Sequence, residues 1–193
     1  MNWITKFIKP KIVSLFKKKT AESDQVLWTT CECKNLIYKE DLQKNFNCCP
    51  KCGAHHKLSC VERFKIFFDN KVYKIIDTPL PKDDPINFVD TKKYTDRLKL
   101  ARKITKQDDA VAIATGKVEN IQVTVGAQDF RFIGGSFGAA SGEAFICGVQ
   151  HAIDNKNPFI FYSCSGGQRM MESSIALMQM SRTVLAVNEL KKN

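Results

Sequence analysis

The chain has 193 residues, of which 44% are hydrophobic and 26% are charged, and its formal net charge is +10 at pH 7. These proportions are typical of a globular protein with one medium-sized domain and a small additional module. No segment of the sequence contains the roughly 20 apolar residues of a membrane span, and the N-terminus lacks the apolar stretch of a secretory signal. The eight cysteines are grouped rather than spread along the chain, which favours a reducing, cytoplasmic compartment.

Residues 1–27 are predicted to form a basic N-terminal arm. Its first 20 residues contain no acidic side chain, and its lysines are Lys6, Lys9, Lys11, Lys17, Lys18 and Lys19. A basic arm suits an anionic partner such as a nucleotide-bearing cofactor, an acidic subunit or nucleic acid. A solvated tail without a partner is the competing interpretation.

A cysteine-rich module is predicted over residues 28–58. The segment Cys49-Pro50-Lys51-Cys52-Gly53 has the spacing of a zinc knuckle, in which two thiolates bind one metal ion. The first pair, Cys31 and Cys33, is separated by only one residue, so we expect a strained first knuckle. Reduced, metal-free thiols are the competing interpretation. The alternative metal ligands are Cys48, His55 and His56.

A helical connector is predicted over residues 59–109. It starts with a helix over residues 59–69, because Phe64, Phe67 and Phe68 recur on one side at helical spacing. Residues 77–109 are polar, contain three prolines and include a charged helix over residues 91–105. We expect this segment to wrap a larger core.

From residue 110 to residue 193 the sequence predicts a packed α/β core in the order β-β-α-β-α. The first two β-rich segments, residues 110–118 and 121–130, are separated by two residues, as in a hairpin. A helix is expected over residues 139–154, then a strand over residues 159–163, and then a second helix to about residue 190. Three cysteines are expected to be buried free thiols, remote from the metal. They are Cys60, Cys147 and Cys164.

A glycine-rich turn precedes each of the two helices expected in the core. The first turn runs from Gly134 to Gly138 (GGSFG) and exposes backbone amides that suit a phosphate or a carbonyl oxygen. Close packing of the helix explains this turn nearly as well. The second turn, Ser165-Gly166-Gly167, repeats the same strand-to-helix architecture, which makes it the stronger signal.

The second turn admits two chemical interpretations. A nucleophile at Cys164 or Ser165 needs a nearby base, and His151, the one histidine of the core, is expected on a helix surface. Two consecutive glycines at the start of a helix instead offer two backbone amides to one oxyanion, without a covalent intermediate. We therefore favour an amide cradle formed by Gly166 and Gly167.

Three motifs follow the cysteine module along the chain. They are Phe88–Leu98 (FVDTKKYTDRL), Phe132–Gly138 (FIGGSFG) and Ser163–Met180 (SCSGGQRMMESSIALMQM). In this order they resemble the β subunits of bacterial acetyl-CoA carboxylase carboxyltransferase, over nearly the whole chain. The resemblance implies an α/β fold of the crotonase-like (ClpP/crotonase) class, a superhelix of ββα units, with a small N-terminal zinc ribbon in front.

The resemblance also implies an activity and partners. Enzymes of this family move a carboxyl group from carboxybiotin to acetyl-CoA and form malonyl-CoA for fatty acid synthesis. The biotin is implied only on a separate biotin carboxyl carrier protein, which biotin carboxylase loads. The carboxyltransferase α subunit is the implied partner, in an α2β2 assembly with the active site between the subunits.

Site residues are implied by the same resemblance. The catalytic amides would be those of Gly166 and Gly167, facing either the enolate of the acyl-CoA thioester or the ureido oxygen of biotin. The residues that shape the acyl-CoA pocket would be Gly134, Gly135, Ser136 and Gly138. One zinc ion per chain would be held by Cys31, Cys33, Cys49 and Cys52.

The sequence departs from the family in three places. The first knuckle is one residue short, and Gln168 stands where alanine is common, at the expected helix start. The chain also stops at Asn193, so the superhelix is expected to be incomplete at its C-terminus. Apolar residues of the last helix are then expected to lack packing partners. They include Ile175, Met178 and Leu185.

Two other functions compete with the enzyme. One is a truncated, inactive subunit that only binds its α partner. The other is a zinc-ribbon protein that binds nucleic acid through its basic arm and ribbon. The α/β core argues against the second, because a nucleic-acid-binding module does not need acyl-CoA motifs.

Overall fold

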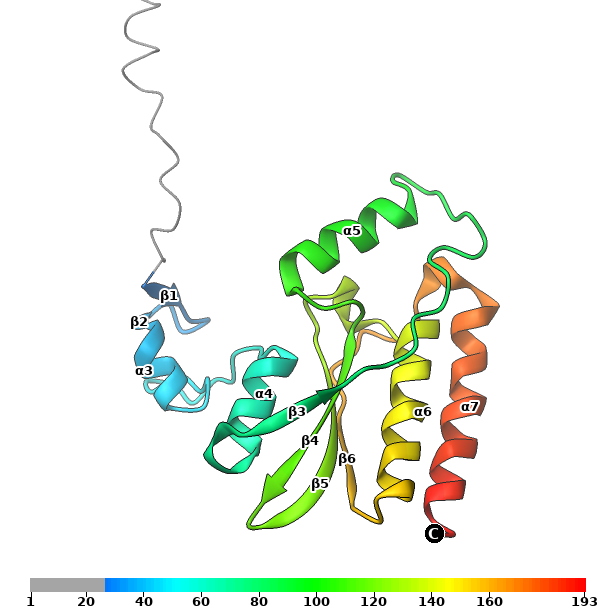
Figure 1. Ribbon diagram of the computed structural model, residues 1–193. Coiled ribbons are helices and arrows are strands. Elements are labelled where there is room, and N and C mark those ends of the chain that lie inside the picture. Colours follow the sequence, from blue (N-terminus) through cyan, green and yellow to red (C-terminus); the bar gives the residue numbers. More distant parts are fainter. Residues whose placement is uncertain (1–26) are drawn as a thin grey trace, which may run out of the picture. The chain divides into compact units, whose positions relative to one another are not determined.

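The computed structural model describes residues 27–193, and the predicted basic arm at residues 1–26 lies outside the described residues (Figure 1). The chain divides into two compact units between His56 and Lys57. Within residues 27–193, no helix combines the length and the apolar character needed to cross a bilayer.

The first unit is a small ribbon. Its strands β1 (Trp28–Thr30) and β2 (Leu36–Tyr38) pair antiparallel, and helix α3 (Lys39–Lys44) follows directly. The unit buries few apolar side chains, and they surround two of the cysteines. The sequence indicated the strand at residues 36–38 but neither β1 nor α3.

The second unit is built on a four-stranded sheet with the strand order β3-β4-β5-β6. Strands β3 (Tyr73–Ile76), β4 (Val111–Val118) and β5 (Ile121–Gln128) are antiparallel, whereas β6 (Phe159–Tyr162) pairs parallel to β5. The predicted β4–β5 hairpin is confirmed, with both turn residues at positive φ, as a two-residue turn requires. Strand β3 was not predicted.

Helices cover both faces of this sheet (Figure 1). Helix α4 (Cys60–Phe67) packs Phe64 against Ala114 and Val125 on one face. Helix α6 (Ala139–Asp154) packs Ala144 against Ile113 on the other. Neighbouring strand residues point to opposite faces, so residues 113 and 114 of β4 serve different cores.

Helix α7 (Ser174–Leu190) forms an outer layer on α6. The side chains of Met178 and Leu185 on α7 are 61% and 67% exposed. This agrees with the sequence expectation for these two residues, whereas Ile175, the third residue of that expectation, is half-buried.

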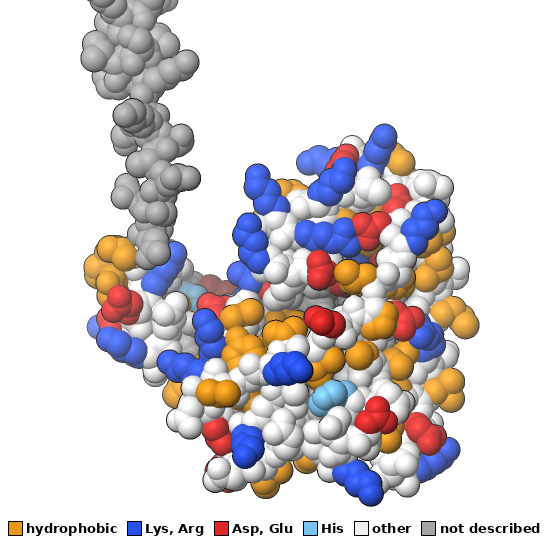
Figure 2. All heavy atoms as spheres, in the orientation of Figure 1, with side chains coloured by type: hydrophobic (Ala, Val, Ile, Leu, Met, Phe, Trp, Pro, Cys, Tyr) orange, Lys and Arg blue, Asp and Glu red, His pale blue; other side chains and the backbone are white. Residues whose placement is uncertain are grey.

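Helix α5 (Tyr94–Thr105) closes one end of the sheet. Its inner side buries Tyr94, Leu98 and Ala101 against Phe132 and Met171. Lysine and arginine side chains gather over its outer side (Figure 2). Phe132 lies just before the first glycine-rich turn, and Met171 lies just after the second. Helix α5, which belongs to the predicted connector, therefore packs beside both turns.

Candidate active site

The four cysteines of the ribbon come together at one point. Their sulfur atoms all lie within 4.8 Å of one another. The Sγ atoms of Cys31 and Cys52 are 3.6 Å apart, and those of Cys33 and Cys49 are 3.9 Å apart. A tetrahedron with zinc–sulfur bonds of about 2.3 Å has sulfur–sulfur edges of about 3.8 Å, so the donor set fits a tetrahedral metal ion.

The short first knuckle is accommodated by its turn. Lys34 adopts a positive φ of 64° and donates its N–H to the carbonyl oxygen of Cys31 at 2.8 Å. In the second knuckle Gly53 has a φ of 74° and donates its N–H to the carbonyl oxygen of Cys49, four residues earlier, at 2.9 Å. The turn of the first knuckle is thus one residue shorter than that of the second, which matches the shorter spacing of its cysteines.

The alternative ligands lie outside this cluster. The Sγ atom of Cys48 is 3.1 Å from Nδ1 of His55, and this pair does not join the four sulfurs. Of the three cysteines expected to be buried and remote from the metal, Cys60 is buried, Cys147 is partly exposed and Cys164 is exposed. Burial raises the pKa of the Cys60 thiol to about 12, so this thiol is unreactive.

The two glycine-rich turns lie side by side. Phe137 donates its N–H to the carbonyl oxygen of Gly167 at 2.9 Å and accepts from the N–H of Arg169 at 3.0 Å. These bonds form a parallel bridge between Phe137 and Gln168. Segments that are 30 residues apart in the sequence thereby form one local structure.

Gln128, the last residue of β5, ties the turns together a second time. Its side chain is buried, donates to the carbonyl oxygen of Gly135 at 2.6 Å and accepts from the N–H of Cys164 at 3.2 Å. The turns approach so closely that a Cβ atom on Gly135 would lie 2.1 Å from the carbonyl oxygen of Cys164. Gly135 also has a φ of 64°, so two independent reasons, the close approach and the positive φ, require glycine at this position.

The amides proposed for the cradle already have acceptors in the described structure. The N–H of Gly166 donates to the carbonyl oxygen of Gly134 at 2.9 Å, and the N–H of Gly167 donates to Oγ of Ser165 at 3.0 Å. The expectation that the glycine pair starts a helix is wrong, because α7 begins only at Ser174. A 3₁₀ turn, Met170–Glu172, intervenes, so Gln168 does not crowd the helix start and these amides are not the helix N-terminus.

A pocket of about 540 Å³ opens beside the second turn. Most of its lining is apolar and comes from the first turn, β6, α6 and α7. The lining includes Phe137, Phe145, Phe161, Gly167, Met180 and Val184. Residues of both turns therefore face a space in which an apolar ligand can lie.

Within the described residues, His151 does not lie beside Cys164, as the base of a nucleophile would. His151 lies near the C-terminal end of α6 and its Nδ1 is 2.9 Å from Oγ1 of Thr124. Thr124 pairs with Phe159 at the start of β6, whereas Cys164 follows the end of that strand. Because the histidine and the thiol belong to opposite ends of β6, the geometry favours amides over a nucleophile.

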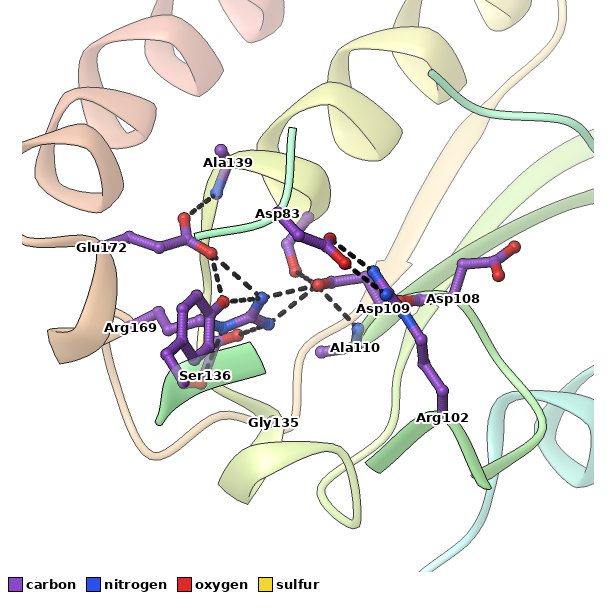
Figure 3. Close-up of polar contacts among 12 residues, drawn as sticks. Asp83, Arg102, Asp108, Asp109, Ala110, Gly135, Ser136, Ala139, Arg169 and Glu172 are labelled. Carbon is purple, nitrogen blue, oxygen red and sulfur yellow. Dashed lines mark hydrogen bonds and ion pairs between the residues drawn. The ribbon is translucent and has the colours of Figure 1, made fainter. Parts of the chain in front are cut away.

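The segment after the glycine pair carries a buried arginine at the centre of a polar cluster (Figure 3). The guanidinium of Arg169 pairs with both carboxylate oxygens of Asp109, at 2.6 and 2.8 Å, and lies 3.3 Å from Glu172. Its Nη2 also donates to the carbonyl oxygen of Ser136 at 2.7 Å, and its Nε to Oγ of Ser136 at 3.2 Å. Ser136 of the first turn and Asp109, two residues before β4, thus meet at one side chain that follows the second turn.

Both carboxylates of this cluster have further donors. Asp109 accepts from the hydroxyl of Ser141 at 2.6 Å, and Glu172 accepts from the hydroxyl of Tyr94 at 2.6 Å. Glu172 also accepts from the N–H of Ala139, at the N-terminus of α6, at 2.6 Å. The cluster is well satisfied, as buried charges must be.

Electrostatics keep the Arg169 guanidinium charged. Burial alone would lower its pKa, but hydrogen bonds to Asp109 and the charge of that carboxylate raise the pKa above its ordinary value. Burial also raises the pKa of Tyr94, and the charge of Arg169 opposes that rise. Tyr94 therefore stays a neutral hydroxyl that donates to Glu172.

Sequence reasoning missed this cluster. Arg169 and Glu172 fall within the Ser163–Met180 motif but received no role, and Asp109 was assigned to a connector. One signal was available: an arginine and an acidic residue three positions apart, in a segment otherwise expected to be apolar helix.

Two family profiles match the chain. The acetyl-CoA carboxylase zinc finger domain matches residues 28–52. The carboxyl transferase domain matches residues 84–192, more than half of the chain. The two matches cover the cysteine cluster and both glycine-rich turns.

Curated relatives match along the whole chain. The acetyl-coenzyme A carboxylase carboxyl transferase subunit beta of Pelagibacter ubique is 47% identical over 197 aligned residues, covering 100% of this chain and 63% of the relative. The subunit of the same name from Jannaschia sp. is 40% identical, with 100% and 60% coverage. The chain thus spans less than two thirds of the length of these relatives.

Solved structures show the fold. A transcarboxylase 12S structure with hydrolysed methylmalonyl-coenzyme A superimposes with a TM-score of 0.53 at 21% identity, covering 79% of this chain and 25% of that one. A Pseudomonas malonate decarboxylase hetero-dimer gives 0.50 at 18% identity, with 70% and 48% coverage. The predicted α/β, crotonase-like class is confirmed. The chain therefore belongs to the carboxyl transferase family, and along its full length it is similar to the β subunits of acetyl-CoA carboxylase carboxyl transferase.

Proposed function

We propose that the chain forms the acyl-CoA side of a carboxyltransferase. In this proposal a carboxyl group passes from carboxybiotin to acetyl-CoA and gives malonyl-CoA. The observation that carries the proposal is the pair of glycine-rich turns, joined by the Phe137–Gln168 bridge beside an apolar pocket. That arrangement offers backbone donors and an apolar surface to one thioester.

The amide cradle of Gly166 and Gly167 is proposed to hold the oxygen on which negative charge develops, either the enolate oxygen of the thioester or the ureido oxygen of biotin. Because both amides have acceptors within the chain, the substrate oxygen must displace the Gly134 carbonyl and the Ser165 hydroxyl. The hydroxyl moves by rotation about one side-chain bond, whereas the Gly134 carbonyl moves with its peptide, whose N–H, that of Gly135, donates to the carbonyl oxygen of Phe132 at 2.9 Å. Backbone donors aimed at a developing charge supply a large part of the catalysis of many enzymes.

The first turn is proposed to shape the acyl-CoA pocket through Gly134, Gly135, Ser136 and Gly138. The uncharged lining near Phe137 and Phe161 suits the thioester and its pantetheine arm rather than the phosphates of CoA. The charged groups of the polar cluster behind the turn are buried and do not line the pocket, whose lining includes one charged residue, Lys191, directly after α7.

Zinc is proposed as the ion held by Cys31, Cys33, Cys49 and Cys52, one per chain. A site with four thiolate ligands has no open position, so the metal would be structural rather than catalytic. These thiols need a reducing environment, and we therefore place the protein in the cytoplasm.

The partners are proposed from the resemblance to the β subunits of acetyl-CoA carboxylase carboxyltransferase. A carboxyltransferase α subunit would complete the active site in an α2β2 assembly, and biotin would arrive on a separate carrier protein that biotin carboxylase loads. Nucleic acid is not proposed as a partner, because the carboxyl transferase profile accounts for the α/β core.

The test is a carboxyl transfer assay. The purified chain is mixed with a carboxyltransferase α subunit and carboxylated biotin carrier protein, acetyl-CoA is added, and malonyl-CoA is measured by chromatography. We expect malonyl-CoA to form only when the chain and acetyl-CoA are both present. Binding of the α subunit without formation of malonyl-CoA would support the inactive-subunit alternative and would contradict the proposed activity.

Two substitutions separate the cradle from a nucleophile. Cys164→Ala and Ser165→Ala are expected to keep most of the turnover, because neither side chain takes part in covalent chemistry. Complete loss of turnover in a folded Cys164→Ala complex would contradict the amide cradle and would restore the nucleophile.

A further inference from the structure

One peptide unit of the first turn is held from both of its ends. Between Ser136 and Phe137, the carbonyl oxygen accepts from the guanidinium of Arg169 and the N–H donates to the carbonyl oxygen of Gly167. The next carbonyl, that of Phe137, accepts from the N–H of Arg169. A rotation of this peptide would break bonds to the second turn on both sides.

Arg169 is itself fixed from outside the turns. Its side chain is 0% exposed, and its planar fork meets both oxygens of Asp109 at the start of β4. The ring of Phe132 lies 5.4 Å from the guanidinium carbon. Because a guanidinium is rigid and planar, the position of Asp109 sets the position at which the carbonyl oxygen of Ser136 is held.

We propose that Arg169 is a positioning residue that sets the register of the first glycine-rich turn against the second, and with it the geometry of the amide cradle. Arg169 does not line the pocket, and its side chain bonds neither to a lining residue nor to the cradle amides, so it acts through the Ser136–Phe137 peptide. The claim that Arg169 affects catalysis rests on the proposed function. The claim that Arg169 sets the register of the two turns does not depend on it.

Amide hydrogen exchange of the full chain, followed by NMR, tests the claim about the register of the turns. In Arg169→Lys the charge remains, but one ammonium cannot bind both Asp109 oxygens and the Ser136 carbonyl in one plane. We expect exchange at the Phe137 and Gly166 amides to become about tenfold faster, because the turns open locally. The amides of Ile113 and Val125 in the β4–β5 ladder report opening of the whole unit, and they should change less than about twofold.

Two controls match this variant. Arg102 also pairs with both oxygens of an aspartate, Asp83, at 2.6 and 2.7 Å, but it touches neither turn, so Arg102→Lys should leave the exchange of Phe137 and Gly166 unchanged. Tyr94→Phe removes a hydroxyl from the same cluster without removing a bond to Ser136. It should also leave the turns protected relative to the sheet.

If Arg169→Lys does not fold, Asp109→Asn takes its place. The asparagine keeps the shape of the side chain but weakens the pair with Arg169, and selective loosening of the same two amides is expected. An equal increase of exchange at the turns and in the sheet, in whichever variant folds, would show that the cluster only stabilises the unit. That result would overturn the proposal.

The carboxyl transfer assay provides the kinetic readout. Arg169→Lys should lower kcat by about 100-fold, the order of effect of losing one oxyanion donor, with KM for acetyl-CoA nearly unchanged. Selective loosening of the turns with an unchanged kcat would contradict the role in catalysis. If the unsubstituted chain transfers no carboxyl group, the proposed function fails, and the exchange data alone still decide whether Arg169 positions the turns.

Discussion

The ribbon and the α/β unit are held together by different means. In the described part of the ribbon, residues 27–56, the buried apolar side chains are Ile37, Leu42 and two of the cysteines. The α/β unit has three clusters of buried apolar side chains and a fully satisfied ion cluster around Arg169. Small modules bury too little surface to fold on hydrophobic burial alone, so the ribbon depends on a cross-link that the larger unit does not need.

The difference has a functional side. In the ribbon, the residues that suit a metal are also those that hold the fold, so function and stability cannot be separated there. In the α/β unit, the cores lie on the two faces of the sheet and the glycine-rich turns lie at its end. A change in the turns can therefore alter chemistry without removing the core.

Metal removal is expected to show the largest difference in stability between the ribbon and the α/β unit. Structural zinc in small modules contributes about 10–16 kcal/mol of apparent binding free energy, so a chelator or Cys49→Ser should unfold residues 27–56. The α/β unit should keep its NMR spectrum, because none of its residues belongs to the cysteine cluster. Elemental analysis should find one zinc ion per chain. A zinc content near zero, or a ribbon that stays folded without metal, would contradict this view.

A substitution in the apolar core should destabilise the α/β unit rather than the ribbon. Phe64 is 0% exposed, and Phe64→Ala is expected to lower the free energy of unfolding of the α/β unit by about 3–5 kcal/mol through the cavity it leaves. Leu185→Ala, at a side chain that is 67% exposed, is the control and should change it by less than about 0.5 kcal/mol. Urea denaturation measures both. Equal effects of the two substitutions would show that Phe64 is not part of the core.

Two adjacent glycines, Gly134 and Gly135, test how closely the two turns approach each other. Gly134 and Gly135 have nearly the same φ, 65° and 64°, but a Cβ on Gly134 meets nothing within 4 Å. Gly134→Ala should therefore cost only the backbone strain, about 1–2 kcal/mol. Gly135→Ala should cost distinctly more, because its Cβ would collide with the carbonyl oxygen of Cys164. Thermal unfolding compares the two variants, and equal costs would mean that the turns do not approach each other this closely.

The smallest effect is expected at the surface. Hydrogen bonds from Arg102, opposed by partial burial, hold the pKa of Asp83 below its ordinary value. A lowered pKa stabilises the folded state above the unfolded pKa of about 3.9, and this contribution is lost as the pH falls through the lowered value.

Asp83→Asn should therefore cost less than about 1 kcal/mol at pH 7, since the aspartate side chain is 44% exposed, and progressively less in acid. Asp108→Asn is the control, because within residues 27–193 the Asp108 carboxylate forms no ion pair. Urea denaturation at neutral and acid pH measures both variants. A loss of stability in Asp83→Asn that grows as the pH falls would contradict a lowered pKa of Asp83 in the folded state.

The sequence predicted the parts of this fold that local patterns determine. The β4–β5 hairpin, α6 and β6 appear at nearly the expected residues, because alternation, turn residues and helical spacing are local signals. Strand β3 was missed because its pairing with β4 joins segments about forty residues apart. The start of α7 was placed too early, because an arginine and a glutamate three residues apart are also compatible with a helix, and the partner that draws Arg169 into a buried cluster, Asp109, lies 60 residues earlier in the chain.

The candidate site was predicted in its composition but not in its contacts. The glycine pairs and the cysteines are visible as motifs. The adjacency of the two turns, the occupied amide of Gly166 and the link from Arg169 to Asp109 depend on how strands β4 to β6 assemble. Such long-range contacts have no signature in one sequence.

The side chain of Gln128 has a consequence for transplanting this site. Its amide group donates to the carbonyl oxygen of Gly135 in the first turn and accepts from the N–H of Cys164 beside the second, so it fixes the distance between the two turns. A graft that moves either turn alone into another scaffold loses that spacing, however faithfully its loop sequence is copied. The smallest piece that can be moved is therefore defined in space rather than along the chain: the end of β5 together with both turns.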